Sequence, residues 1–274
     1  LGIKDGIIVN DRMETSAPDI YAVGDAVQVK HYVTGNDALI SLAGPANKQG
    51  RIAADNVCGG DSRYPGSLGS SVIKVFGMTA AATGINETTA KKAGIDADKV
   101  VLSPLSHAGY YPGGKVMTMK VVFEKETYRL LGAQIIGYEG VDKRIDVLAT
   151  AICAGLSATR LKDLDLAYAP PYSSAKDPVN MAGFMIDNLS KGILKQFHLE
   201  DVYNLPTDGS VTLLDVRTVF EYGRGHVKGF RNIPVDELRE RLGEIDPGKP
   251  VYVMCQSGLR SYVAARILAG NGFD

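Results

Sequence analysis

The alternation of apolar and polar residues divides the chain into short strands and amphipathic helices. Short apolar runs bounded by turn residues predict buried strands, and apolar residues that recur at helical spacing predict helices with one buried face. Strands are expected at residues 6–9, 20–23, 72–76, 100–105, 115–123, 128–136 and 251–254. Helices are expected within residues 42–56 and at residues 86–93, 145–152, 177–189 and 261–269. This mixture predicts a protein with both α/β and α+β domains.

Residues at the ends of two predicted helices define their limits. Asn86 is suited to cap the first turn of its helix, and Gly94 and Gly155 are suited to end the helices that precede them. In the second of these helices, Cys153 continues the apolar face that includes Ile152. We therefore expect Cys153 to lie in the core.

The composition excludes several classes of protein. The 274 residues carry a net charge of −1 without a long basic or acidic block, so we expect neither a nucleic-acid partner nor an anionic membrane surface. No apolar run approaches the length of a membrane span, and no signal peptide opens the chain. Three scattered cysteines are too few for a disulfide framework or a zinc site, and they favour a reducing, cytoplasmic location.

The strongest candidate for chemistry is Cys255, which lies between a predicted strand and a predicted helix. A tight loop at this point turns backbone N–H groups towards the sulfur, and the helix dipole adds partial positive charge. Arg260 adds a full positive charge. Both effects are expected to lower the pKa of the thiol and to make the nucleophilic thiolate available near neutral pH.

This loop resembles the active-site loop of rhodanese-type sulfurtransferases. Four residues separate Cys255 from Arg260, whereas the related phosphatase loops hold one more. A second stretch, residues 214–234, resembles the first conserved block of the same family, with Phe230 as a departure where a small residue is usual. The resemblance implies that Cys255 carries a sulfane sulfur as a persulfide. It also implies that the intervening residues bind the sulfur; they are Gln256, Ser257, Gly258 and Leu259.

Charged residues in that upstream block also have a purely structural interpretation. Asp215, Arg217 and Glu221 are expected to form an ion-pair network, and His226 is expected to stabilise a turn.

Residues 15–25 closely resemble the second flavin-binding motif of the pyridine nucleotide-disulfide oxidoreductases. The resemblance implies that Asp25 holds the ribityl chain of FAD at a strand end. The other residues of this motif that we assign to the flavin site are Thr15, Tyr21 and Gly24.

The stretch at residues 42–56 is closest to the coenzyme A-disulfide reductase branch of that family. The resemblance places Pro45 and Ala46 beside the flavin and makes Asn47 a contact to coenzyme A. The alternative for Asn47 is an exposed polar residue of a helix.

Two loops carry aromatic residues that simple packing does not require. Tyr110 lies on a glycine-rich loop, and Tyr168 precedes a rigid segment that ends in Lys176. Phenols donate hydrogen bonds to anions, and a lysine pairs with phosphate. The resemblance implies that Tyr110 supports the redox sulfur of a partner subunit, that Tyr168 lies by the flavin and that Lys176 contacts coenzyme A. The alternatives are aromatic packing at a dimer interface and, for the neighbouring His107, a solvated side chain.

These resemblances divide the chain into four parts. Residues 1–68 are expected to be the end of a FAD-binding Rossmann-like domain, and residues 69–191 an α+β dimerisation domain. A connector at residues 192–198 leads to an α/β rhodanese-like domain at residues 199–274. No G-x-G-x-x-G motif follows a strand, so the phosphate sites for FAD and NAD(P)H are expected outside this stretch, in a longer polypeptide.

The sequence therefore predicts part of a homodimeric, flavin-dependent NAD(P)H reductase of persulfide, polysulfide or coenzyme A disulfide. One alternative is a flavoenzyme of the NADH oxidase or peroxidase type. The other is a non-catalytic dimeric sulfur carrier that presents the Cys255 persulfide to other proteins.

Overall fold

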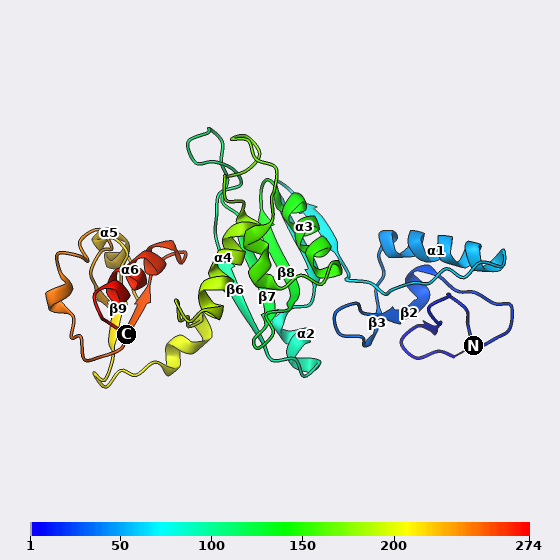
Figure 1. Cartoon of the computed structure of the whole chain (residues 1–274), viewed down its shortest axis with the longest axis horizontal. Helices are drawn as coiled ribbons and strands as arrows, with labels where there is room; N and C mark the ends of the chain where they lie inside the picture. Colours follow the sequence, from blue (N-terminus) through cyan, green and yellow to red (C-terminus); the bar gives the residue numbers. More distant parts are fainter. Residues whose placement is uncertain (1) are drawn as a thin grey trace. The chain divides into compact units, whose positions relative to one another are not determined.

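The computed structural model describes residues 2–274 and separates them into two compact units (Figure 1). The first unit ends at Phe184, and the second extends from Met185 to Asp274.

The first unit opens with a small sheet in the order β1-β2-β3. Strand β1 (Ile7–Ile8) is parallel to β2 (Val27–Lys30), which is antiparallel to β3 (Asp37–Leu39). Helix α1 (Ala43–Val57) follows. Its Ala53 joins a buried apolar cluster formed with residues of β2 and of the loops on either side of the helix, namely Met13, Val27, Val29 and Tyr64.

The strand predicted at residues 20–23 is absent. Tyr21 forms only an isolated bridge with Glu14, and the chain then enters a short 3-10 helix, Gly24–Ala26. Asp19 adopts a positive φ of 59° just before this segment. The local turns therefore prevent the regular pairing that a strand requires.

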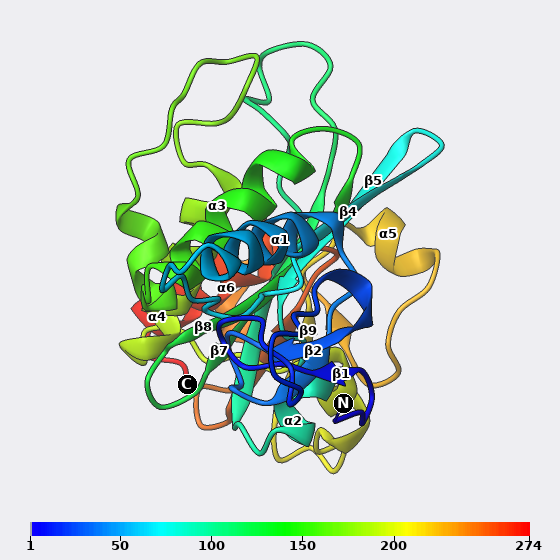
Figure 2. The same ribbon diagram turned by 90° about the vertical axis from the view of Figure 1, so that its right-hand side faces the viewer.

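A five-stranded antiparallel sheet forms the rest of the first unit, in the order β4-β5-β8-β7-β6. Figure 2 shows β4 and β5 as a hairpin at the edge of this sheet. The strands are β4 (Ser71–Val75), β5 (Met78–Gly84), β6 (Ala97–Leu102), β7 (Thr118–Glu124) and β8 (Leu130–Gly137). Strand β6 begins and ends three residues earlier than expected. It ends before Pro104, which lacks the N–H that would extend the ladder.

Helices complete the first unit. As predicted, Asn86 caps α2 (Glu87–Lys92), with its side chain accepting a hydrogen bond of 2.9 Å from the amide of Thr89. Helix α3 (Val141–Cys153) packs on β5 and β8, and a 3-10 segment, Ala158–Asp163, follows it. Helix α4 (Pro178–Ser190) continues to the unit boundary and beyond.

The prediction that Cys153 is a core residue is wrong, because its side chain is exposed. Ile145, Leu148 and Ile152 bury their side chains, but Cys153 is the last residue of the helix and lies one position round from Ile152. Successive helical positions differ by about 100°. That rotation takes Cys153 off the buried face.

The second unit is built on a parallel sheet in the order β10-β9-β11. Its strands are β9 (Thr212–Asp215), β10 (Arg231–Asn232) and β11 (Val251–Met254). Its helices are α5 (Val219–Gly223), α6 (Leu259–Gly270) and the 3-10 segments Leu199–Asn204 and Leu242–Glu244. The register pairs Met254 with Asp215, so the segments after β9 and β11 leave the sheet at the same edge.

Candidate functional site

Cys255 follows β11 directly and is half-buried at the start of the loop that leads to α6. Gly258 adopts a positive φ of 99°, which glycine tolerates without strain, and its amide donates a hydrogen bond of 3.1 Å to the Cys255 Sγ. The Ser261 hydroxyl lies 3.5 Å from the same sulfur and donates to the Gly258 carbonyl at 2.9 Å. The loop therefore surrounds the thiol with hydrogen-bonding groups of Gly258 and Ser261.

The pKa of Cys255 is lowered from its ordinary value. Burial of the thiol acts in the opposite direction and raises the pKa, but hydrogen bonds from the Ser261 side chain and from the amides of Ser261, Ser257 and Gly258 outweigh it. These donors stabilise the thiolate more than the thiol. The arrangement supplies a nucleophilic sulfur, as the sequence predicted.

The other loop residues lie around this sulfur and remain accessible. The side chains or backbones of Gln256, Ser257, Gly258 and Leu259 are exposed. A molecule that approaches the Cys255 sulfur from solvent therefore contacts these exposed loop residues.

Arg260 lies in the first turn of α6, but it is not a free positive charge. Its two terminal nitrogens donate to the two carboxylate oxygens of Glu221, each at 2.7 Å. These bonds, followed by those from the side chain and amide of Thr218, hold the pKa of Glu221 far below its usual range. The positive charge that the sequence predicts beside the thiol is therefore paired with a carboxylate from α5.

Asp215 and Arg217 form the expected ion pair, and Glu221 interacts electrostatically with Arg217 while it forms its own salt bridge with Arg260. Arg217 binds the fully buried Asp215 carboxylate through contacts of 2.6 to 3.0 Å. Asn232 donates to the carbonyls of both residues, at 2.9 and 2.8 Å. This network fixes the end of β9 beside β10.

The remaining upstream residues have structural positions. His226 stacks on Tyr222 with ring centroids 3.9 Å apart, and its Nδ1 lies 3.2 Å from the Tyr222 carbonyl oxygen. The Tyr222 hydroxyl donates to the carbonyl of Phe230 at 2.6 Å, and Phe230 itself is buried.

In the first unit, the segment Gly24–Ala26 lies against helix α1. Gly24 has a φ of +83°, and its amide donates a hydrogen bond of 2.8 Å to the side-chain oxygen of the buried Gln49. A Cβ on Gly24 would lie 3.9 Å from the Cβ of Ala46. Asp25 is exposed next to this contact. Gln49 was not predicted, although its signal is visible as a polar residue one turn before the core-facing Ala53.

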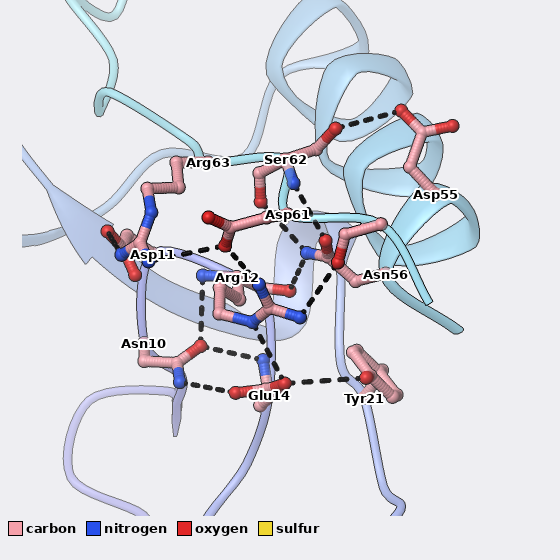
Figure 3. Close-up of polar contacts among 11 residues, drawn as sticks. Asn10, Asp11, Arg12, Glu14, Tyr21, Asp55, Asn56, Asp61, Ser62 and Arg63 are labelled. Atoms are coloured by element: carbon pink, nitrogen blue, oxygen red, sulfur yellow. Dashed lines mark hydrogen bonds and ion pairs between the residues drawn. The ribbon is translucent and has the colours of Figure 1, made fainter. Parts of the chain in front are cut away.

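A hydrogen-bonded network braces the loop that precedes Gly24 (Figure 3). Glu14 accepts hydrogen bonds from Asn10 at 2.7 Å, from Arg12 at 3.1 Å and from the Tyr21 hydroxyl at 3.4 Å. Arg12 also pairs with Asp61. Tyr21 therefore fixes this loop through Glu14.

Two other predicted site residues of this unit make local contacts. Thr15 closes a turn with Ala17, with its hydroxyl 3.2 Å from the Ala17 amide. Asn47 is exposed, and its side-chain amide donates 2.9 Å back to the carbonyl of Ala43. Pro45 is partly buried in the first turn of α1.

Tyr110 and Tyr168 meet although 58 residues separate them. Their hydroxyl oxygens are 2.5 Å apart, both side chains are exposed, and this hydrogen bond raises the pKa of Tyr168. Lys176, at the end of the second loop, is also exposed. His107 is buried with its ring edge against Tyr111, so the expectation of a solvated histidine is wrong.

A buried arginine that was not predicted links these two loops. Arg144, on α3, is 1% exposed and binds the Asp177 carboxylate through Nη2 at 2.9 Å and Nε at 3.2 Å. Its Nη2 also donates to the Ser106 carbonyl at 2.9 Å and to the Tyr172 carbonyl at 3.3 Å. The sequence signal for this buried arginine was a positively charged residue among the apolar residues that recur at helical spacing in α3.

Two further features of residues 2–274 bear on function. This part of the chain contains no cluster of three or more histidine, cysteine or acidic side chains placed to hold a metal ion. Its helices include none with the length and apolar character needed to cross a membrane.

Comparison with known families assigns both units. Residues 70–178 match the pyridine nucleotide-disulphide oxidoreductase dimerisation domain, and residues 198–274 match the rhodanese-like domain. The chain belongs to the pyridine nucleotide-disulphide oxidoreductase family and carries a rhodanese-like domain.

Two solved structures are similar to this chain over its whole length. Reduced CoADR-RHD from Bacillus anthracis is 47% identical with a TM-score of 0.94, and the NAD-dependent persulfide reductase from A. fulgidus is 41% identical with a TM-score of 0.89. Each similarity covers 100% of this chain and 49% of the other. The CoA-dependent NAD(P)H sulfur oxidoreductase of Pyrococcus abyssi is 38% identical over 183 residues, or 65% of this chain and 41% of that relative. The chain thus spans about half the length of these oxidoreductases or less.

Proposed function

We propose that this chain is the dimerising and sulfur-carrying part of a flavin-dependent NAD(P)H reductase of persulfide, polysulfide or coenzyme A disulfide. The observation that carries the proposal is the Cys255 loop, in which three backbone amides and a hydroxyl lower the pKa of an accessible thiol. The names of the relatives support the choice of sulfur substrates.

In the proposed reaction of the second unit, the Cys255 thiolate attacks the outer sulfur of a persulfide, R–S–SH. A new S–S bond forms at Cys255, the original S–S bond breaks, and the thiolate R–S⁻ leaves. No net oxidation or reduction occurs in this step. Gly258 and Ser261, which donate to the Cys255 sulfur, would hold the charge on sulfur before the attack and after the transfer.

The first unit supplies part of a flavin site in this proposal. Asp25 would accept hydrogen bonds from the ribityl hydroxyls of FAD, and Gly24 leaves room for that approach because it carries no side chain. Pro45 and Ala46 would face the flavin, while Thr15 and Tyr21 fix the loop beside it. Bound FAD would pass electrons from NAD(P)H to the sulfur substrate.

We propose a homodimer in which exposed residues of one subunit complete the site of its partner. The family of residues 70–178 is described as a dimerisation domain. Tyr110 and Tyr168 are joined by a hydrogen bond yet exposed, as is Lys176, so all three are free to meet a second subunit. Lys176 and Asn47 would contact coenzyme A, the lysine through its charge and the asparagine through its amide.

The test is NADH oxidation by the native polypeptide that contains these 274 residues, supplied with an organic persulfide. We expect oxidation that depends on the sulfur substrate and falls in Cys255→Ser but not in the matched control Cys58→Ser, since Cys58 is an exposed cysteine at the end of α1. NADH oxidation that is independent of added sulfur, or unchanged in Cys255→Ser, would contradict the proposal.

A further inference from the structure

The charged groups that interact around Cys255 balance each other. Asp215 neutralises Arg217, and Glu221 neutralises Arg260. Arg260 makes two hydrogen bonds of 2.7 Å to Glu221, a paired geometry that strengthens the contact and fixes its direction. This four-residue set, the Cys255 charge cluster, therefore has no net charge.

The donors that face the sulfur are neutral. They are the amides of Ser257, Gly258 and Ser261 and the hydroxyl of Ser261. Such a group of dipoles suits one negative charge on sulfur, whereas a second negative charge brought to the same place requires a counter-cation. The nearest guanidinium of the loop, Arg260, is already engaged by Glu221.

The two elements joined by this ion pair also expose apolar side chains. Leu259, beside Arg260 on the loop, is 71% exposed, and Phe220, beside Glu221 on α5, is 73% exposed. Val219 is exposed as well. Exposed apolar groups on the two elements that this ion pair joins favour a substrate with an uncharged organic stem over a small dianion.

We propose that Glu221 determines the sulfur donor of Cys255: by neutralising Arg260, it selects organic persulfides and disfavours dianionic inorganic donors such as thiosulfate. This inference rests on the proposed sulfur-carrying function and adds a specificity-determining residue to it. Glu221 acts through Arg260 and does not touch the sulfur.

Both donors give a balanced transfer, and they differ in the charge that they bring to the thiolate. With an alkyl persulfide, Cys255–S⁻ attacks the outer sulfur and an alkyl thiolate leaves. With thiosulfate, Cys255–S⁻ attacks the outer sulfur, the S–S bond breaks and sulfite leaves with two negative charges. Only the second reaction brings a dianion against the thiolate.

The test is the rate at which Cys255 of the 274-residue chain gains one sulfur atom, followed by rapid alkylation and mass spectrometry. Ethyl persulfide and thiosulfate are compared as donors. In the wild type we expect ethyl persulfide to react at least about tenfold faster. In Glu221→Gln we expect the thiosulfate rate to rise about tenfold and the ethyl persulfide rate to change less than about threefold, since like charges repel less once Arg260 is free.

Two further variants separate charge from folding. Glu237→Gln makes the same change in net charge at the exposed pair with Arg241, outside the Cys255 charge cluster, and is expected to change neither rate. Glu221 also forms a capping box with Thr218 at the start of α5. Leu259→Lys adds a cation without touching that capping box, and it is expected to raise the thiosulfate rate even if Glu221→Gln folds poorly. The gain should decrease at high salt, because ions screen exposed charges.

Equal rates for both donors in the wild type would overturn this inference while leaving the sulfur-carrying function in place. So would a thiosulfate rate that rises equally in Glu221→Gln and Glu237→Gln. If neither donor loads Cys255 in the wild type, the proposed function itself fails.

Discussion

At the scale of single residues, the reactive thiol depends on hydrogen bonds more than on ionic charge. The lowered pKa of Cys255 results from donors within six residues of it, and Ser261 provides two of them. We therefore expect Ser261→Ala to raise the pKa of Cys255.

The rate of alkylation by iodoacetamide as a function of pH measures this change, because only the thiolate reacts. The wild type should reach half its maximal rate at a lower pH than an ordinary cysteine, and Ser261→Ala should move that midpoint upward. The assay uses a Cys58→Ser, Cys153→Ser background, since both side chains are exposed. An unchanged midpoint in Ser261→Ala would contradict the assignment.

A second residue-scale prediction concerns Glu87 at the start of α2. Burial would raise its pKa, but hydrogen bonds from Lys120, its own amide and Lys99 lower it from 4.5 to about 2. The folded state therefore binds its proton less readily than the unfolded state, so the stabilisation is complete above pH 4.5 and is lost as pH falls to about 2.

Glu87→Gln should remove this dependence. Since a third of the side chain is exposed, we expect a loss below about 1 kcal/mol at pH 7 and none near pH 2. Urea unfolding of both proteins across this pH range measures the difference. A loss that is the same at all pH values would show that the pairing is not the cause.

The sequence predicts the identity of these residues better than their partners. Cys255 and its loop are contiguous, so their spacing alone indicates the chemistry. Glu221 is 39 residues from Arg260, and only the fold shows that the two side chains meet. Sequence spacing contains no record of that contact, so the pairing of Arg260 could not be predicted.

At the scale of elements, Arg144 holds two loops in one arrangement. It binds Asp177 and the carbonyls of Ser106 and Tyr172, which lie in the loops that carry Tyr110 and Tyr168. Removing the arginine leaves the buried Asp177 carboxylate with the more distant Lys143, at 3.9 Å, to offset its charge. We expect Arg144→Met to lower the free energy of unfolding by about 3–5 kcal/mol.

The matched control is Arg160→Met, which removes an exposed pair with Asp163 and should cost about 0–1 kcal/mol. Denaturant unfolding gives both values, and hydrogen exchange shows whether the backbone of residues 106–117 and 165–177 loses protection in Arg144→Met. Equal effects of the two variants, or unchanged exchange in both loops, would argue against the linking role of Arg144.

Most elements follow from their periodicity, and the failures have local causes. The hairpin of β7 and β8 and the helices α2, α3 and α4 lie close to their predicted positions because apolar spacing and capping residues agree there. Residues 20–23 carry apolar side chains without forming a strand, since the turn at Asp19 and the segment Gly24–Ala26 leave them without a regular neighbour. Apolar character alone therefore did not distinguish the segments that form regular elements from residues 20–23, which do not.

At the scale of the whole molecule, exposed apolar side chains on the sheet edge support the proposed dimer. They lie on one face of β4 and in the turn that follows it, and they are Ile73, Val75 and Phe76. Isolated exposed apolar residues are common, but a contiguous group favours an interface. We expect the 29.2 kDa chain to sediment at twice that mass.

Ile73→Lys should shift the chain towards a monomer, because a charge buried against a partner lacks a counter-ion. The control Lys74→Glu alters charge at the next position of the same strand, whose side chain points to the other face of the sheet. Sedimentation of the wild type as a monomer over the micromolar range would contradict the dimer.

The central claim is that Cys255 specifically accepts a sulfane sulfur. The most direct measurement is mass spectrometry of the digested chain after brief exposure to an organic persulfide, with all three cysteines followed in parallel. We predict that the Cys255 peptide gains one sulfur atom, which a dithiol removes as hydrogen sulfide, while Cys58 and Cys153 stay unmodified. Sulfur that is spread evenly over the three cysteines, or that is absent from Cys255, would contradict the account.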